Sequence, residues 1–215
     1  MADRYPLMLD LEGRPCLVVG GGAVATRKVL GLLAAGARVT VRAPELSAPL
    51  AELASAGRIR HDDGAYLALG VAPDGRSWSL VFAATDDVAV NQRVVADADA
   101  AGAWANDASD PTGGPAAVPA SWHEGPVTLA VSTSGVHPGA ARWLCDQASV
   151  AVTPEALAAL ALIDEIRLED VAGGGLGRRP DWRTAVGSGT LDLIREGHLA
   201  EAKERLQACL SSSSD

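Results

Sequence analysis

Short apolar runs alternate with segments of helical periodicity through the first half of the chain. The apolar runs predict buried strands, and each ends at a glycine, proline or aspartate, at residues 14–20, 38–44, 79–87 and 103–111. The segments between them predict helices at residues 23–37, 50–58 and 91–102. Strands that alternate with helices in this order predict an α/β fold, a Rossmann-like doubly wound parallel sheet.

The predicted sheet gathers polar and glycine residues at one edge. Ligands of doubly wound sheets bind outside the carboxyl ends of the strands. Those ends carry residues 20–22, Arg42, residues 85–87 and residues 106–110. We therefore expect the functional site along this edge.

The second half of the chain has a different pattern. Residues 112–126 are rich in glycine and proline and predict a connection. A strand and turn follow at 127–135, then a helix at 137–147 with proline in its first turn. From Thr153 onward the pattern is helical, apart from a Gly-rich stretch at 172–182. That stretch follows a helix rather than a strand, so it predicts a loop and not a second phosphate site.

Composition and charge narrow the classes of function. The hydrophobic fraction is 48%, aromatic residues make up 4%, and Ala, Val and Leu dominate, which favours helices layered on a parallel sheet. The net charge of -9 argues against nucleic acid as the main partner. The three cysteines are far apart, with no CxxC or Cys/His cluster, so no metal site or disulfide framework is predicted. The first residues lack a signal-peptide core and no apolar run would span a membrane, so we expect a cytoplasmic protein without a membrane partner.

The stretch after the first strand has the spacing of a dinucleotide-binding loop. Gly20-x-Gly22-x-x-Ala25 fits G-x-G-x-x-G/A, in which the first glycine permits the tight turn and the second lets a pyrophosphate approach. At the end of the second strand, where an acidic residue would bind the ribose, the chain has Arg42. Arginine there can accommodate the 2′-phosphate of NADP, or it can be a solvated strand end. The sequence leaves NAD and NADP both open.

Four stretches together resemble the precorrin-2 dehydrogenases, including the bifunctional dehydrogenase/ferrochelatases of sirohaem synthesis. They are residues 5–45 (YPLMLDLEGRPCLVVGGGAVATRKVLGLLAAGARVTVRAPE), 82–94 (FAATDDVAVNQRV), 127–144 (VTLAVSTSGVHPGAARWL) and 178–182 (RRPDW). They occur in the family's order over nearly the whole chain, which makes the resemblance more specific than the glycine loop alone.

The resemblance implies an activity and an organisation. It implies NAD-dependent oxidation of precorrin-2, a tetrapyrrole, to sirohydrochlorin, and in some members insertion of Fe²⁺ as a substrate. It also implies a homodimer in which a Rossmann domain (1–112), a dimerisation segment (113–150) and a helical domain (151–215) follow one another. Two alternatives stay open: a family member redirected to another substrate, and a non-catalytic protein that binds a dinucleotide or a tetrapyrrole.

The resemblance also assigns residues. Matches to the family's nucleotide-binding segments are Gly20, Gly21, Gly22, Ala23, Val24, Thr85 and Asp86. Thr133 falls where the family has a small hydroxyl residue near the active cleft. Asn106 opens the family's N-V-x-D stretch, but Ser109 stands where that stretch has its aspartate.

The departure at Ser109 matters because the chemistry needs a proton acceptor. Oxidation of the tetrapyrrole removes a hydride and a proton, and metal insertion displaces pyrrole protons; a carboxylate accepts them more readily than a serine. Asp110, one residue along, is the first candidate for the base and Asp107 is the second. The alternative is that both aspartates cap a turn.

A carboxylate-rich substrate also needs polar and cationic contacts from an acidic protein. The candidates for substrate binding are Asn106, Ser109, His137 and Arg142, with His123, Arg27 and Lys28 as further possibilities. Trp104 and Trp122 are candidates to flank a flat macrocycle. For each of these side chains, a surface or packing role is the alternative.

Overall fold

A computed structural model describes residues 4–110, 112–172, 182–187 and 189–212. The chain divides into two compact units. One comprises the chain up to Pro119 together with Ser132–His137, and the other comprises Ala120–Val131 and the chain from Pro138 onward.

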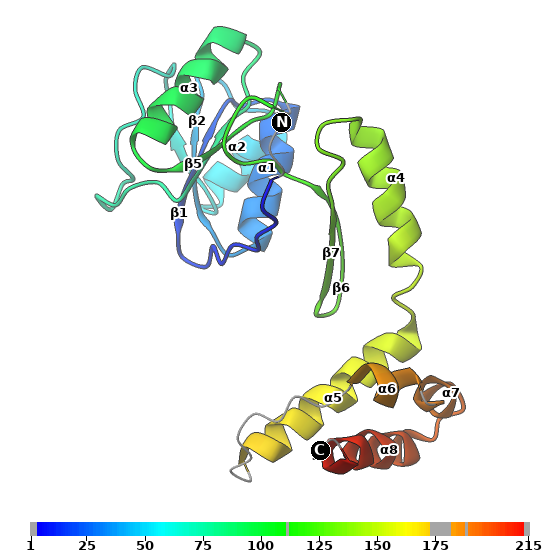
Figure 1. The fold of residues 1–215 in the computed structure, drawn as a ribbon. Coiled ribbons are helices and arrows are strands. Elements are labelled where there is room, and N and C mark those ends of the chain that lie inside the picture. The colour runs from blue at the N-terminus through cyan, green and yellow to red at the C-terminus, as the bar shows by residue number, and fades with distance from the viewer. Residues whose placement is uncertain (1–3, 111, 173–181, 188, 213–215) are drawn as a thin grey trace. The chain divides into compact units, whose positions relative to one another are not determined.

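The first unit is built on a five-stranded parallel sheet. Its strands are β1 (Pro15–Val19), β2 (Arg38–Arg42), β3 (Arg60–Asp62), β4 (Leu80–Ala83) and β5 (Trp104–Asp107), in the spatial order β3-β2-β1-β4-β5. Every pairing between neighbours is parallel. Figure 1 labels β1, β2 and β5 of this sheet together with α1, α2 and α3. The order runs outward from β1 in both directions, so the predicted doubly wound α/β sheet is confirmed.

Helices cover both faces of this sheet because both faces are apolar. Alternate residues of β1 enter two separate cores: Cys16 and Val18 pack towards α1 (Ala23–Ala34) and α2 (Ala48–Ser55). Leu17 and Val19 pack on the other face with residues of α3 (Val88–Ala100). Strands that are buried on both sides have continuous apolar runs, which explains the strand pattern of the sequence.

The buried stripe of α1 is Ala25, Val29 and Leu32. Val24, one position away, is exposed beside the glycine loop. Lys28 is half-buried, and its ammonium lies 5.2 Å from the centre of the Phe82 ring. Burial and the neighbouring Arg27 lower the pKa of Lys28.

The connection from β3 to β4 contains no helix, and an irregular loop covers the sheet there instead. Tyr66, Leu69, Ala72 and Trp78 from this loop are buried in the same core as α3. The sequence pattern did not predict β3, because its three residues, Arg-His-Asp, are polar and partly exposed at the edge of the sheet. An edge strand of this composition produces no apolar run.

The second unit begins with an antiparallel hairpin of β6 (Ala120–Glu124) and β7 (Val127–Val131). The helix α4 (Pro138–Ser149) packs on it, with Arg142 Nη1 donating to the carbonyl of Ser121. The prediction of a connection over 112–126 was therefore wrong for β6. The Gly125-Pro126 pair is the hairpin turn itself, and the small and polar residues of β6 concealed the strand.

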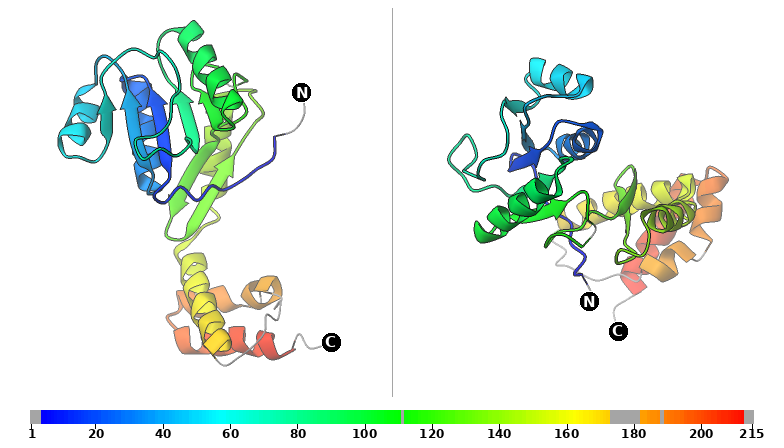
Figure 2. Two further views of the ribbon diagram at one scale, coloured as in Figure 1. Left: turned by 90° about the vertical axis from the view of Figure 1, so that its left-hand side faces the viewer. Right: turned by 90° about the horizontal axis from the view of Figure 1, so that it is seen from above.

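In the described residues of the C-terminal part, the helices are α5 (Pro154–Ala172), α6 (Trp182–Gly187), α7 (Thr190–Arg195) and α8 (Leu199–Ser212) (Figure 2). Buried residues of α5, α7 and α8 meet at Ala159, Ile194 and Ala202, which confirms the predicted helical C-terminal region. The predicted loop at 172–182, most of the RRPDW stretch and the end of the chain lie outside the described residues. No helix in the described ranges has both the length and the apolar character of a membrane span.

Candidate functional site

The glycine loop after β1 is packed so closely that only glycine fits at two positions. Gly20 has φ +123°, and a Cβ there would overlap the carbonyl oxygen of Ala84. A Cβ at Gly21 would overlap the carbonyl oxygen of Glu45. The backbone fixes the loop further, because Gly20 N donates to Arg42 O at 2.9 Å and Ser47 N donates to Gly21 O at 2.8 Å.

The third glycine faces open space instead. A Cβ at Gly22 would meet no atom within 4 Å, and Gly22 caps α1 without a side-chain hydrogen bond. The first amides of a helix without such a cap are available to an anion, and the helix dipole favours negative charge there. Thr26 stabilises the turn, since its Oγ1 donates to Gly22 O at 3.0 Å. Gly22 and the start of α1 therefore fit the pyrophosphate of a dinucleotide.

The loop lines a cavity of about 950 Å³ at the carboxyl ends of β1, β2, β4 and β5. All eight residues predicted for the cofactor lie along it: Gly20, Gly21, Gly22, Ala23, Val24, Arg42, Thr85 and Asp86. Ser109, from the chain after β5, also lines the cavity. The fold thus brings together residues from four separate segments, as expected for the carboxyl edge of a doubly wound sheet.

Arg42 lies at this edge but is not a solvated strand end. Its side chain is only 17% exposed, and its Nε donates to Asp62 Oδ2 at 2.7 Å. Its Nη1 donates to the carbonyl of Ala68 at 2.6 Å, which ties the loop after β3 to the sheet. The guanidinium also lies 5.9 Å from the centre of the Tyr66 ring. The solvated alternative is therefore wrong, because an ion pair and a carbonyl hold the side chain in place.

A network of side chains joins the ends of β4 and β5. Asn91 is fully buried, and its Oδ1 accepts from Thr85 N at 3.1 Å and from Thr85 Oγ1 at 2.7 Å. Its Nδ2 donates to Thr85 O at 3.0 Å and to Ser109 Oγ at 3.2 Å. The Ser109 hydroxyl in turn donates to Asp107 Oδ1 at 2.6 Å, and Ser109 N donates to the same oxygen at 2.8 Å. The hydroxyl proton of Ser109 therefore points at the Asp107 carboxylate, which is 4% exposed.

The other predicted residues of this segment make local contacts. Asp110 is exposed, and its Oδ1 accepts from Thr112 Oγ1 at 2.7 Å and from Thr112 N at 2.8 Å. These hydrogen bonds lower the pKa of Asp110, so it stays ionised and is a weak base. Both aspartates therefore accept from the amide and the hydroxyl of the residue two positions along, but Asp107 is buried and Asp110 is exposed. Asn106 is buried, with Nδ2 donating to Ala116 O at 3.0 Å.

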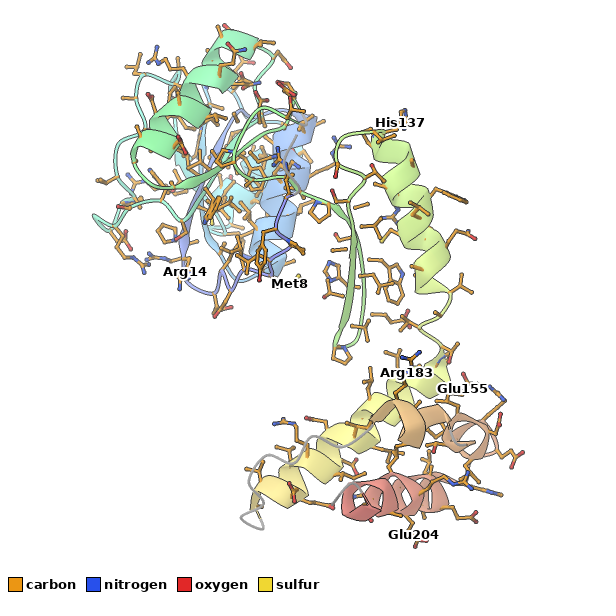
Figure 3. The ribbon with its side chains drawn as sticks, in the orientation of Figure 1. Met8, Arg14, His137, Glu155, Arg183 and Glu204 are labelled. Carbon is orange, nitrogen blue, oxygen red and sulfur yellow. The ribbon has the colours of Figure 1, made fainter. Side chains whose placement is uncertain are left out.

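The remaining candidates lie around the hairpin and α4. Thr133 Oγ1 donates to the carbonyl of His137 at 3.5 Å, and His137 directly precedes α4 (Figure 3). Arg142, on α4, forms an ion pair with Asp146 one turn along, at 3.0 Å. His123 Nδ1 lies 3.0 Å from Thr128 Oγ1 across the hairpin.

The aromatic candidates and Arg27 are on the surface or partly buried. Trp104 is half-exposed at the start of β5, Trp122 is partly buried in β6, and Arg27 is exposed on α1.

Tyr66, Asn91 and Ser47 are among the residues of the site that were not predicted from the sequence. Tyr66 lines the cavity, with its hydroxyl donating to Asp97 Oδ2 at 2.8 Å. Burial and this aspartate raise the pKa of Tyr66. Asn91 joins the network from inside α3, and Ser47 contacts both Thr26 and Gly21. Ser47 precedes α2 with proline in the first turn, which is a helix-start signal that could have been used. Tyr66 had no such signal, because it comes from an irregular loop.

Comparisons with known proteins agree with this geometry. A family model described as "Putative NAD(P)-binding" matches residues 7–120. Siroheme synthase of Gluconacetobacter diazotrophicus is 36% identical over 97% of this chain and 45% of its own length. Siroheme synthase 1 of Yersinia enterocolitica is 37% identical over 97% of this chain and 44% of its own length. The chain thus spans less than half the length of these curated relatives.

A solved structure also matches over almost its full length. It is SirC, a precorrin-2 dehydrogenase, which is 29% identical with a TM-score of 0.67 over 95% of this chain and 98% of its own. The resemblance found from the sequence motifs is thereby confirmed. Both the matched region and the cavity support a nicotinamide dinucleotide as the cofactor. Since residues 7–120 make up more than half of the chain, the protein belongs to this NAD(P)-binding family.

Proposed function

We propose that this protein is an NAD-dependent dehydrogenase that oxidises precorrin-2 to sirohydrochlorin. The observation that carries the proposal is the likeness to SirC, a precorrin-2 dehydrogenase, which extends over 95% of this chain and 98% of that protein. The open helix start at Gly22 and the 950 Å³ cavity supply the dinucleotide site that such an oxidation requires. When bound, NAD⁺ would provide the acceptor for the hydride that the oxidation removes.

The chain's own residues have separate tasks in this proposal. The amides of Gly22, Ala23 and Val24 bind the pyrophosphate at the start of α1, where the helix dipole favours negative charge. Thr85 and Asp86 line the cavity on the side of β4. Arg42 and Tyr66 form the wall at the end of β2.

We assign the proton acceptor to Asp107, acting through Ser109. Ser109 lines the cavity, and its hydroxyl donates to Asp107 at 2.6 Å and accepts from Asn91 at 3.2 Å. A proton taken up by the Ser109 oxygen can therefore be matched by transfer of its own proton to the Asp107 carboxylate. Asp110, the first choice from the sequence, is exposed, and hydrogen bonds from Thr112 lower its pKa. Ser109, which stands at the family's aspartate position, therefore donates a hydrogen bond to the carboxylate of Asp107.

The remaining assignments stay proposals. We propose that Asn106, Thr133, His137 and Arg142 contact the carboxylate-rich substrate. We also propose a homodimer and a division into 1–112, 113–150 and 151–215. A cytoplasmic location remains a prediction.

Fe²⁺ insertion into sirohydrochlorin is a second candidate reaction. The observation that favours it is again the Asp107 carboxylate against Ser109, because metal insertion must also transfer pyrrole protons to an acceptor. In this reaction Fe²⁺ is a substrate. The relatives' name, siroheme synthase, agrees with a place in the same series of reactions.

An anaerobic assay with precorrin-2 tests the main proposal. With NAD⁺, the absorption spectrum of sirohydrochlorin should appear together with NADH, and a parallel sample with Fe²⁺ tests the second reaction. No turnover with either NAD⁺ or NADP⁺ would overturn the proposal. In that case, measured binding of NADH would favour a redirected enzyme or a non-catalytic binding protein.

A further inference from the structure

The acidic residue nearest the end of β2 comes from the neighbouring strand. In dinucleotide-binding folds, a residue at this end reads the adenosine ribose: a carboxylate favours NAD, and an arginine accommodates the extra phosphate of NADP. Here Arg42 occupies the last position of β2, and Asp62 is paired with it in register at the end of β3. Arg42 lines the cavity, and Asp62 acts on this part of it through its ion pair with Arg42.

Asp62 changes what Arg42 can do. Its Oδ2 accepts from Arg42 Nε at 2.7 Å, while Arg42 Nη1 donates to the carbonyl of Ala68 at 2.6 Å. These two contacts direct two edges of the guanidinium towards the protein. The carboxylate also offsets the positive charge, and it is 43% exposed where Arg42 is 17% exposed. A phosphate that approached Arg42 would thus meet a partly engaged cation with a carboxylate beside it.

We infer that Asp62 makes this site select NAD over NADP. It holds the Arg42 guanidinium in an ion pair, offsets its charge and would repel a 2′-phosphate brought next to Arg42. The inference rests on the proposed use of a dinucleotide but not on precorrin-2 as the substrate. Because nucleotide binding is measured without precorrin-2, failure of this inference and failure of the proposed reaction are distinguishable.

The test compares dissociation constants of NADH and NADPH for the whole chain, measured by nucleotide fluorescence and calorimetry. The wild type should bind NADH more tightly. Asp62→Asn should tighten NADPH binding by about tenfold or more, because a charge-assisted contact to the phosphate becomes available, and should change NADH binding by less than about threefold.

Asp63→Asn is the matched control. Asp63 is the next residue, is exposed, and its substitution removes the same charge. It should leave both dissociation constants unchanged at moderate ionic strength, because an exposed charge outside the ion pair is screened.

A double variant shows whether a gain in NADPH binding by Asp62→Asn requires the Arg42 guanidinium or is only a structural effect. Adding Arg42→Gln to Asp62→Asn should abolish the gain in NADPH binding, because the gain requires the freed guanidinium. Melting temperatures show whether each variant is folded.

Three results would overturn the inference. The wild type binds the two nucleotides equally, Asp62→Asn improves NADPH binding no more than Asp63→Asn does, or Glu45→Gln produces the gain that Asp62→Asn does not. The last variant is included because Glu45 is a carboxylate that itself lines the cavity.

Discussion

The carboxyl edge of the sheet has two polar regions that are built in different ways. After β1, the glycine loop presents backbone amides, and its shape depends on the absence of side chains at Gly20 and Gly21. At the ends of β4 and β5, side chains form the site, in the order Thr85, Asn91, Ser109 and Asp107. The shape of the first region depends on close packing, and that of the second depends on matched hydrogen-bond donors and acceptors. Mutations in the two regions should therefore have different effects on stability, nucleotide binding and turnover.

The largest effect is expected at Asp107. Asp107→Asn keeps an acceptor oxygen for Ser109 but removes the base, so turnover of precorrin-2 should fall by about a hundredfold or more. The dissociation constant of NADH should be unchanged, because the amides of the glycine loop are untouched.

Asp110→Asn is the matched control for this prediction, since it removes a carboxylate that caps a turn. It should retain most of the activity. Equal losses in the two variants would contradict the assignment of the base to Asp107.

In the glycine loop, substitution by alanine should change the free energy of unfolding much more at Gly21 than at Gly22. Gly21→Ala places a Cβ against the backbone carbonyl of Glu45, which cannot move without shifting the chain. It should lower the free energy of unfolding by roughly 3 kcal/mol. Gly22→Ala should be almost neutral for stability, because its Cβ faces open space, yet weaken NADH binding. Urea titrations and NADH binding measure both; equal destabilisation by the two substitutions would contradict the packing argument.

The second region should be sensitive to loss of its central amide. Asn91→Ala leaves the backbone N–H and carbonyl of Thr85 without their buried partner, at a cost of about 2 kcal/mol. The exposed neighbour Gln92 is the control, and Gln92→Ala should change the free energy of unfolding by less than about 0.5 kcal/mol. Urea titration of both variants checks this, and similar values would show that the network does not stabilise the fold.

The smallest effect concerns the turn at Asp110 and its dependence on pH. Hydrogen bonds from Thr112 lower the pKa of Asp110 below its ordinary value of 3.8, so the ionised form stabilises the folded state. This contribution is present above the ordinary pKa and is lost as the pH falls through the lowered one. The melting temperature of Asp110→Asn should therefore be below that of the wild type at neutral pH, and the difference should shrink on acidification. A difference that is constant with pH would contradict this account.

The sequence predicted the two regions unequally, for physical reasons. Gly20, Gly22 and Ala25 have the spacing of a dinucleotide loop, so the loop was visible as a motif next to a predicted strand. The close packing that requires glycine at Gly21 was not visible, because that position is free in the motif. The strands buried on both faces were visible as apolar runs. Tyr66 was not, since an irregular loop replaces a helix between β3 and β4. Asp107-x-Ser109 and Asp110-x-Thr112 have the same spacing and form the same local hydrogen bonds. The sequence therefore does not distinguish them, because the burial of Asp107 and the contact between Ser109 and Asn91 arise from the fold.

The roles proposed for the glycine loop and for Asp107 both depend on the protein being a dehydrogenase. The most direct measurement is the anaerobic incubation of the purified protein with precorrin-2 and NAD⁺, followed by absorption spectroscopy. The account predicts that sirohydrochlorin and NADH appear in equal amounts with the wild type and far more slowly with Asp107→Asn. Persistence of the precorrin-2 spectrum with the folded wild type, with NAD⁺ and with NADP⁺ alike, would contradict it.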